Sequence, residues 1–291
     1  MFVEEIWTEK KPKVVCGFLF GALIGEGSYA KVKDVVDQQT LVRRAVKIIK
    51  DSRLRKIPNG KENVDRELKI LRKMRHINVI RLIHTFRDEG KGKLYMFMEY
   101  CVASLQQMAD NATSKHLSES ETHVYFEQLM KGMEYLHAIG VIHKDIKPGN
   151  LLMTRDRILK ITDFGVAEML DPFQPSDFME NAQGTPKFMP PEGVGRDVVR
   201  YSGFAADIWS CGITLYNLLS SEYPFEAPVI IKLFDAIVHT PLQMPTTTEL
   251  GCNAQDLLRG MLEKDPSTRW TIPRIRECDW AKRRFNKVLS R

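Results

Sequence analysis

Cysteine is scarce in this chain of 291 residues, and its five cysteines stand far apart. None belongs to a CxxC pair and their number is odd, which favours reduced thiols over a disulfide framework or a zinc site. No apolar run reaches the roughly 18 residues that cross a bilayer, and the acidic start at residues 1–5 lacks the layout of a signal peptide. We therefore expect a cytoplasmic protein, or one that is also nuclear, without a membrane span.

The composition is that of a folded protein, with 43% hydrophobic and 27% charged residues. At roughly 100–200 residues per domain, the length predicts two domains or one bilobal unit. Lysine and arginine exceed aspartate and glutamate by 43 − 37 = 6, a mild excess spread along the chain. A nucleic-acid binder would need basic residues interleaved with aromatics on one face, and only the basic stretch in the last ten residues approaches this. We therefore expect no nucleic-acid partner.

The first hundred residues carry short β-branched and aromatic runs broken by glycine. These runs predict five antiparallel strands, at residues 18–20, 32–36, 44–49, 79–86 and 94–98. One helix is predicted at residues 61–75, because apolar residues recur there at helical spacing after the turn at 58–60.

Long amphipathic stretches follow. A capping box at Ser118 starts a helix that stops at Gly140, and further helices are predicted at residues 206–219, 253–262 and 272–289. The fold class is therefore α+β, with a small five-stranded antiparallel sheet and one helix before a larger, mainly helical lobe.

A glycine-rich turn lies between two predicted strands, where glycine lets backbone N–H groups approach phosphate oxygens. Alone, the turn is equally compatible with a tight hairpin that binds no ligand. Lys47 on the third strand favours a nucleotide site, since kinase chemistry needs a lysine that holds the α- and β-phosphates. The residues of the turn are Ile24, Gly25, Glu26, Gly27, Ser28, Tyr29, Ala30, Lys31 and Val32.

A lysine among apolar neighbours needs an anion to orient it. Glu67 lies along the apolar stripe of the predicted helix, so we expect a Lys47–Glu67 ion pair. Glu62 and Asp65 on the same helix are the rival acids, and Glu67 could instead be one of several exposed acids.

The strongest indication of a catalytic site is the segment 143–152 together with Asp163-Phe164-Gly165 further along the chain. Phosphoryl transfer needs a carboxylate near the attacking hydroxyl and oxygen ligands for a metal ion. Asp145 fits the first role, and Lys147 can neutralise charge on the transferred phosphate. Asn150 and Asp163 can supply hard oxygen ligands to Mg²⁺, with Mn²⁺ as a substitute.

With these motifs, residues 17–285 resemble eukaryotic protein kinases, which have two lobes around an ATP cleft. The resemblance implies an N-lobe at 17–98 after an extension at 1–16, a hinge at 99–103, a C-lobe at 104–285 and a basic tail at 286–291. It also implies that the hinge residues Glu99 and Cys101 bind adenine and that Met98 guards the rear pocket. The residues expected to enclose the adenine ring are Val32, Ala45 and Leu152.

Lys147 and Thr185, in Gly184-Thr185-Pro186, match the serine/threonine class of kinases. The same resemblance implies an ion pair between Glu192 and Arg269, and hydrogen bonds from the backbone of the catalytic loop to Asp207. The expected activity is transfer of the ATP γ-phosphate to protein hydroxyls. The residues assigned to catalysis are Asp145, Lys147 and Thr185.

A closer resemblance is to the liver kinase B group, the Par-type master kinases. Residues 58–60 and Lys144 discriminate this group, because most kinases have arginine where Lys144 stands. The resemblance implies an upstream kinase for activation-loop threonines of AMP-activated-kinase-related kinases. Its partners would be a STRAD-like pseudokinase and an armadillo-like scaffold. Phe173 and Phe178 are apolar residues of the segment 163–192, and Lys144 replaces the arginine that usually receives a phosphate from it, so we expect a partner, instead of phosphorylation at Ser176, to order this segment. The alternative is that the two phenylalanines fold back onto this chain's own lobe.

A catalytically dead scaffold with the same fold is the alternative from another class. The residues that separate the two are Lys47, Asp145, Asn150 and Asp163, and all four are present. The sequence therefore favours an active enzyme.

Overall fold

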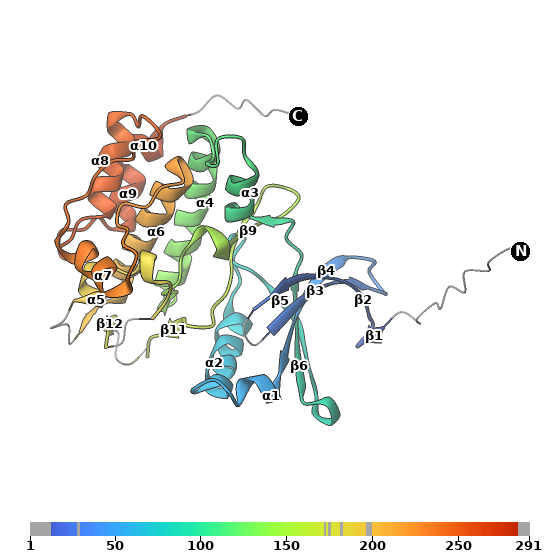
Figure 1. Cartoon of the computed structure of the whole chain (residues 1–291). Coiled ribbons are helices and arrows are strands. Elements are labelled where there is room, and N and C mark those ends of the chain that lie inside the picture. The colour runs from blue at the N-terminus through green and yellow to red at the C-terminus, as the bar shows by residue number, and fades with distance from the viewer. Residues whose placement is uncertain are drawn as a thin grey trace, which may run out of the picture. The chain divides into compact units, whose positions relative to one another are not determined.

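The computed structural model describes residues 13–27, 30–171, 173, 176–180, 183–195 and 200–284. These residues form two compact units. The first unit comprises the described residues up to 62 together with 81–100, and the second comprises 63–80 and the described residues from 101 onward. Figure 1 shows a curled sheet in the first unit and mainly helices in the second.

The first unit is an antiparallel sheet with the strand order β1-β2-β3-β4-β6-β5. A strand overlaps each of the five predicted ranges, although the one predicted at 79–86 begins only at Leu82, and a two-residue strand, β1, adds a sixth. The short helices of this unit are α1 (Asp51–Leu54) and the 3₁₀ helix η1 (Glu89–Lys91). The strands are β1 (Val14–Val15), β2 (Phe18–Glu26), β3 (Ala30–Asp37), β4 (Arg43–Lys50), β5 (Leu82–Asp88) and β6 (Lys93–Glu99).

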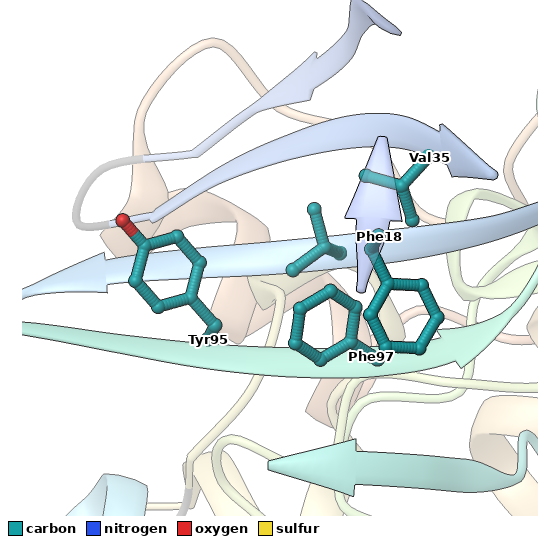
Figure 2. Close-up of a cluster of buried hydrophobic side chains, with 5 residues drawn as sticks. Phe18, Val35, Tyr95 and Phe97 are labelled. Carbon is teal, nitrogen blue, oxygen red and sulfur yellow. The ribbon is translucent and has the colours of Figure 1, made fainter. Parts of the chain in front are cut away.

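One face of this sheet carries an aromatic core. Phe18 stacks on Phe97 with ring centroids 4.1 Å apart, and Val35, Val46 and Tyr95 complete the buried cluster. Figure 2 shows Phe18, Val35, Tyr95 and Phe97 gathered over the strands. Burial of each large side chain stabilises the fold by about 1.5–3 kcal/mol, so this cluster fixes the strand register.

Helix α2 (Gly60–Lys73) starts after the predicted turn, in which Asn59 adopts a left-handed φ of 53°. From Asn63 onward the helix belongs to the second unit. Within that unit the chain after α2 is tied down, because Arg75 N donates to the Tyr135 hydroxyl at 2.8 Å and Ile80 N donates to Ile161 O at 2.9 Å.

The second unit is mainly helical. Its helices are α3 (Leu105–Asn111), α4 (Glu119–Ala138), η2 (Pro148–Asn150), η3 (Pro186–Phe188), α5 (Pro191–Val194), α6 (Gly203–Ser220), α7 (Ile230–His239), α8 (Cys252–Met261), α9 (Ile272–Glu277) and α10 (Asp279–Lys282). Short strand pairs join the loops between them. These strands are β7 (Ala103–Ser104), β8 (Val141–Ile142), β9 (Leu151–Met153), β10 (Leu159–Ile161), β11 (Glu168–Met169), β12 (Phe178–Met179) and β13 (Tyr201–Ser202).

Helix α6 forms the centre of this unit and is buried over most of its length, as its uniformly apolar sequence predicts. It contacts α4, α8 and the 3₁₀ helix η3, and Figure 1 shows α4 and α6 side by side. The predicted capping box of α4 is also confirmed, with Ser118 and Glu121 as its two members.

The prediction of one helix at residues 272–289 is wrong for the described residues 272–284, and its last five residues, 285–289, lie outside the described residues. Two short helices, α9 and α10, replace it, and Cys278 between them has an extended ψ of 156°. The Cys278 side chain accepts a hydrogen bond from Ala281 N at the start of α10. The apolar spacing in the sequence continues across Cys278, but the helix does not, because the Cys278 backbone is extended and its side chain caps a new helix.

All five cysteines are free thiols. Among the described residues no helix has the length and apolar character needed to cross a membrane.

Candidate active site

The second unit gathers Asp145, Lys147 and Thr185 into one hydrogen-bonded set. Lys147 Nζ lies 2.8 Å from Asp145 Oδ2 and donates to Thr185 Oγ1 at 2.6 Å. Thr185 donates to Asp145 Oδ1 from its hydroxyl at 2.7 Å and from its backbone N–H at 2.9 Å. Both carboxylate oxygens of Asp145 therefore have donors, and the orientation of its side chain is fixed. The three residues predicted to be catalytic lie together.

Asn150 and Asp163, the predicted metal ligands, come from adjoining segments. Asn150 Nδ2 donates to Asp145 Oδ2 at 2.9 Å and to its backbone O at 2.8 Å, so the amide oxygen is the atom left for a ligand role. Leu151 pairs with Ile161 in the β9–β10 ladder, and Thr162 N donates to Asn150 O at 3.0 Å. Asp163 is the residue after Thr162 and therefore lies beside Asn150.

This donor set fits a magnesium ion. Mg²⁺ is usually held by one or two protein carboxylates, with substrate phosphates as further ligands, so an amide oxygen and a carboxylate are sufficient. A self-contained metal cage is a different arrangement, and the described part of the chain holds no group of three or more His, Cys, Asp or Glu side chains suited to one.

Asp207, at the start of α6, holds the backbone of the catalytic loop. Its side chain is fully buried, with Oδ1 accepting from Lys144 N at 2.9 Å and Oδ2 accepting from His143 N at 2.9 Å. His137 Nε2 lies 3.0 Å from Oδ2. The predicted contact between Asp207 and the loop backbone is confirmed.

His143 is anchored through both ring nitrogens. Asp145 N donates to Nδ1 at 3.2 Å, and Nε2 lies 3.0 Å from Thr162 O. A backbone N–H can only donate and a carbonyl can only accept, so Nδ1 is the acceptor of the ring and Nε2 its donor. The ring meets the buried Phe164 ring edge-on, with centroids 5.0 Å apart. These contacts join the loop of Asp145 to the turn of Asp163.

The segment before Thr185 approaches the catalytic loop closely. Gly184 has a φ of 129°, and a Cβ at this position would lie 2.3 Å from Lys144 O. Only glycine fits here. Thr185 can therefore reach Asp145 without displacing the loop.

The predicted Glu192–Arg269 ion pair is also confirmed. Arg269 donates to both carboxylate oxygens of Glu192, at 2.6 and 2.8 Å. The side chains are 1% and 11% exposed for Arg269 and Glu192. Arg269 also donates to Ala205 O and Glu263 O, each at 2.9 Å. This pair anchors the segment that follows Thr185.

Two groups close to this ion pair have shifted pKa values. Burial and the charge of Arg269 lower the pKa of Lys264 to about 8. Burial raises the pKa of Tyr201 to about 12, and the charge of Glu192 adds to the effect. Lys264 also contacts the ion pair through its backbone, because Arg269 Nη2 donates to Lys264 O at 3.3 Å.

In the first unit, strand register places the predicted nucleotide residues on one face of the sheet. Val32 pairs with Lys47, and Ala45 pairs with Met98. Alternate residues of a strand share a face, so all four side chains lie on the same side. The aromatic core with Val46 occupies the opposite side.

The glycine-rich turn joins β2 and β3, as the spacing predicts. Gly25 pairs with Val32, and Gly27 N donates to Ala30 O at 2.9 Å. Ser28 and Tyr29 lie outside the described residues. Phosphate binding by this turn stays a prediction.

The remaining predicted residues divide between the units. Glu67 is the buried acid of α2 and is 2% exposed, whereas the rivals Glu62 and Asp65 are exposed. Lys47 belongs to the first unit and Glu67 to the second, so their ion pair stays a prediction. The adenine contacts also stay predictions, because Glu99 lies in the first unit whereas Cys101 and Leu152 lie in the second.

The sequence interpretation missed one contact beside the catalytic loop. Lys144 Nζ donates to Glu168 Oε2 at 2.6 Å. The signal was the lysine in place of the common arginine, but nothing in the sequence named its partner.

The family model of the protein kinase domain matches residues 18–281. The chain belongs to the protein kinase family. Serine/threonine-protein kinase stk11 of Xenopus laevis is 50% identical over 275 residues, which cover 94% of this chain and 63% of the relative. Its Homo sapiens counterpart, STK11, is 48% identical with the same coverage. Serine/threonine-protein kinase par-4 of Caenorhabditis elegans is 50% identical over 268 residues, 92% of this chain and 43% of the relative.

The chain spans about three fifths or less of the length of these relatives. Within it, the segments that a kinase domain needs for phosphoryl transfer are present. Asp145, Lys147 and Asn150 are held in place by an ion pair and hydrogen bonds, and phosphoryl transfer in protein kinases depends mainly on groups positioned in this way.

Proposed function

We propose that this chain is an ATP-dependent serine/threonine protein kinase that transfers the γ-phosphate to protein hydroxyls. The single observation that carries the proposal is that Asp145, Lys147 and Thr185 each contact the other two, through an ion pair and two side-chain hydrogen bonds. In it a buried carboxylate, a cation and a hydroxyl meet at the point where a substrate hydroxyl would have to lie. The similar proteins are serine/threonine-protein kinases by name, which supports the serine/threonine class.

The residues have separable roles in this proposal. Asp145 accepts the hydrogen bond of the incoming hydroxyl and orients its oxygen toward the phosphate. Lys147, 2.8 Å from Asp145 Oδ2, adds positive charge where negative charge accumulates on the transferred group. Asn150 and Asp163 would hold Mg²⁺, or Mn²⁺ in its place. When bound with ATP, the metal ion would neutralise the negative charges of the phosphates.

We further propose that the chain acts as an upstream kinase on activation-loop threonines of AMP-activated-kinase-related kinases. The support is the resemblance to the liver kinase B group together with 48–50% identity to stk11 and par-4 proteins. The proposed cellular location is the cytoplasm, alone or together with the nucleus.

Activation by partners is part of the same proposal. The partners would be a STRAD-like pseudokinase and an armadillo-like scaffold. Phe173 and Phe178, 92% and 59% exposed, are apolar side chains on the segment between Asp163 and Glu192. Large exposed apolar side chains often mark protein-binding surfaces.

The experiment is a kinase assay on an AMP-activated-kinase activation-loop peptide, with and without the STRAD-like partner and scaffold. A peptide with alanine in place of the target threonine is the matched control. The proposal predicts phosphate incorporation into the threonine peptide alone, with a rise when the partners are added. Full activity of the purified chain without partners would refute partner activation, and no transfer in any combination would refute the upstream role.

A further inference from the structure

The first unit has a cluster of cations on the face of the sheet that carries the aromatic core. Alternate residues of a strand share a face, so Lys50 on β4 and Lys93 on β6 lie on the same side as the buried Val46. The strand register sets Lys50 directly opposite Lys93. Like charges directly opposite each other destabilise a ladder, so strand pairing alone does not account for these two lysines.

A cavity of about 150 Å³ lies beside the two lysines. Five of the seven described residues that line it are cations, and none of the seven is an acid. All seven belong to the first unit. The cations are Lys13, Lys31, Lys50, Arg53 and Lys93, and the other two residues are Ile48 and Tyr95.

The positive charge of this cavity is only partly neutralised. Glu26 lies 3.0 Å from Lys31 Nζ and 3.5 Å from Arg53 Nη2, so one carboxylate serves two cations. The other three cations have no ion pair within the part of the chain that the structure describes. These three are Lys13, Lys50 and Lys93.

The charges next to the cavity add to the repulsion between its cations. Asp88 faces Lys93 across the β5–β6 ladder, but its side chain pairs with Lys91 at 3.1 Å. Burial and the charges of Lys93 and Lys33 lower the pKa of Lys13. An anion bound in the cavity would relieve this repulsion.

Tyr95 can supply a neutral donor to the same cavity. The residue is 1% exposed and lines the cavity. No hydrogen bond between described residues uses its hydroxyl, which points away from Phe18 and Phe97 in Figure 2. A buried hydroxyl without a partner costs free energy, and an anionic oxygen in the cavity would accept its hydrogen bond.

We propose that this cavity binds adjacent phosphate groups of a compact anion, either a soluble polyphosphate or the headgroup of a phosphorylated lipid. Lysine and arginine side chains bind phosphate oxygens by charge-assisted hydrogen bonds. The cavity is smaller than the roughly 300–1,000 Å³ pockets that enclose drug-sized ligands, so it receives phosphate groups while the rest of the ligand stays in solvent.

The position of the cavity excludes other anions as its main ligand. Strands β4 and β6 lie inside the sheet, so no free strand edge is present there for an extended acidic peptide. A nucleic-acid strand needs a long positively charged groove, whereas these cations line one small cavity. Lys47, the predicted ATP phosphate ligand, alternates with Ile48 on β4 and lies on the opposite face.

The test titrates the full chain with inositol hexakisphosphate in a calorimeter. We expect saturable binding that weakens as salt is raised, because screening reduces the attraction between exposed charges. Lys50→Gln together with Lys93→Gln should lower the affinity at least tenfold. Removal of the like-charge pair should leave the thermal unfolding midpoint at or above that of wild type. If the double variant does not fold, either single substitution should still lower the affinity at least threefold.

Two control variants locate the binding. Lys56→Gln together with Lys61→Gln removes two exposed lysines of the first unit that do not line the cavity, and its affinity should stay within twofold of wild type. Lys47→Met should also bind the hexakisphosphate within twofold of wild type, because its substitution lies on the opposite face. This control separates the proposed site from the proposed ATP site.

Vesicles distinguish the two sources of phosphate. Selective binding to vesicles with phosphatidylinositol bisphosphate, compared with phosphatidylserine vesicles of equal charge, would support a lipid headgroup. Binding of the soluble hexakisphosphate alone would support a soluble polyphosphate. The proposal would be overturned by no binding to either probe, by an equal loss of affinity in the Lys56 and Lys61 control or in Lys47→Met, by equal binding to both kinds of vesicle, or by tighter binding of an acidic peptide than of the hexakisphosphate.

Discussion

Replacement of Asp207 by asparagine tests how the catalytic loop is held. Oδ1 of Asp207 accepts from Lys144 N, and Oδ2 accepts from His143 N and lies beside His137 Nε2. An amide has only one oxygen, so in either orientation its NH₂ group faces at least one N–H donor. A hydrogen bond to a charged group contributes about 1.5–3 kcal/mol, and an unsatisfied buried donor costs about 1–3 kcal/mol.

We therefore expect Asp207→Asn to lower the free energy of unfolding by about 3 kcal/mol, out of a typical total of about 5–15 kcal/mol. Equilibrium urea unfolding measures this loss, and kcat should fall with it because the loop carries Asp145. Asp256→Asn is the matched control: Asp256 pairs with Arg259 on the exposed surface of α8, and its loss should cost under about 1 kcal/mol. A change below about 1 kcal/mol in Asp207→Asn, with wild-type kcat, would refute this reasoning.

Three further predictions concern the ion pair and the proposed nucleotide site. Glu192→Gln leaves the buried Arg269 with one charge partner fewer and should lower the unfolding free energy by about 3–5 kcal/mol in urea titrations; a loss as small as that of a surface pair would contradict the buried role. The pKa of Lys264 is about 8 in the folded chain and 10.5 in the unfolded chain, so on raising the pH the folded state loses this proton first. The free energy of unfolding should therefore rise between about pH 8 and pH 10.5, and this rise should be absent in Lys264→Met. An identical pH dependence of the two chains would refute the lowered pKa of Lys264. Lys47→Met should abolish phosphate transfer while the thermal unfolding midpoint stays near that of wild type, and normal turnover would exclude the proposed phosphate contact.

The elements with a strong local pattern could be predicted from the sequence. The capping box at Ser118 fixes the start of α4, and the uniformly apolar run at 206–219 predicts the buried α6 because both signals are local. Cys278 shows the limit: the apolar spacing continues across it, but its extended backbone ends α9 and starts α10. A single backbone angle is decided by tertiary packing, which spacing does not report.

In the candidate site, too, the contacts between residues close in the sequence could be predicted, and those between distant residues could not. Asp145, Lys147 and Asn150 stand within six residues, so their proximity follows from the motif itself. The contact of Thr185 with Asp145 joins residues 40 positions apart. The sequence assigned Thr185 to catalysis through the family resemblance alone and did not predict this contact. The Lys144–Glu168 pair was not predicted, because it depends on the pairing of β8 with β11, and two-residue strands leave almost no trace in a sequence.

The most direct test of the whole account measures γ-phosphate transfer from ATP to a threonine peptide by wild type and by Asp145→Asn, with nucleotide binding followed by calorimetry. Loss of one preorganised contact in the transition state costs about 2.7–4 kcal/mol, so we predict a fall in kcat of about 10²–10³-fold with unchanged binding of ATP and Mg²⁺. Wild-type turnover by Asp145→Asn, or failure of well-folded wild-type chain to bind ATP with Mg²⁺, alone or with its partners, would contradict the account.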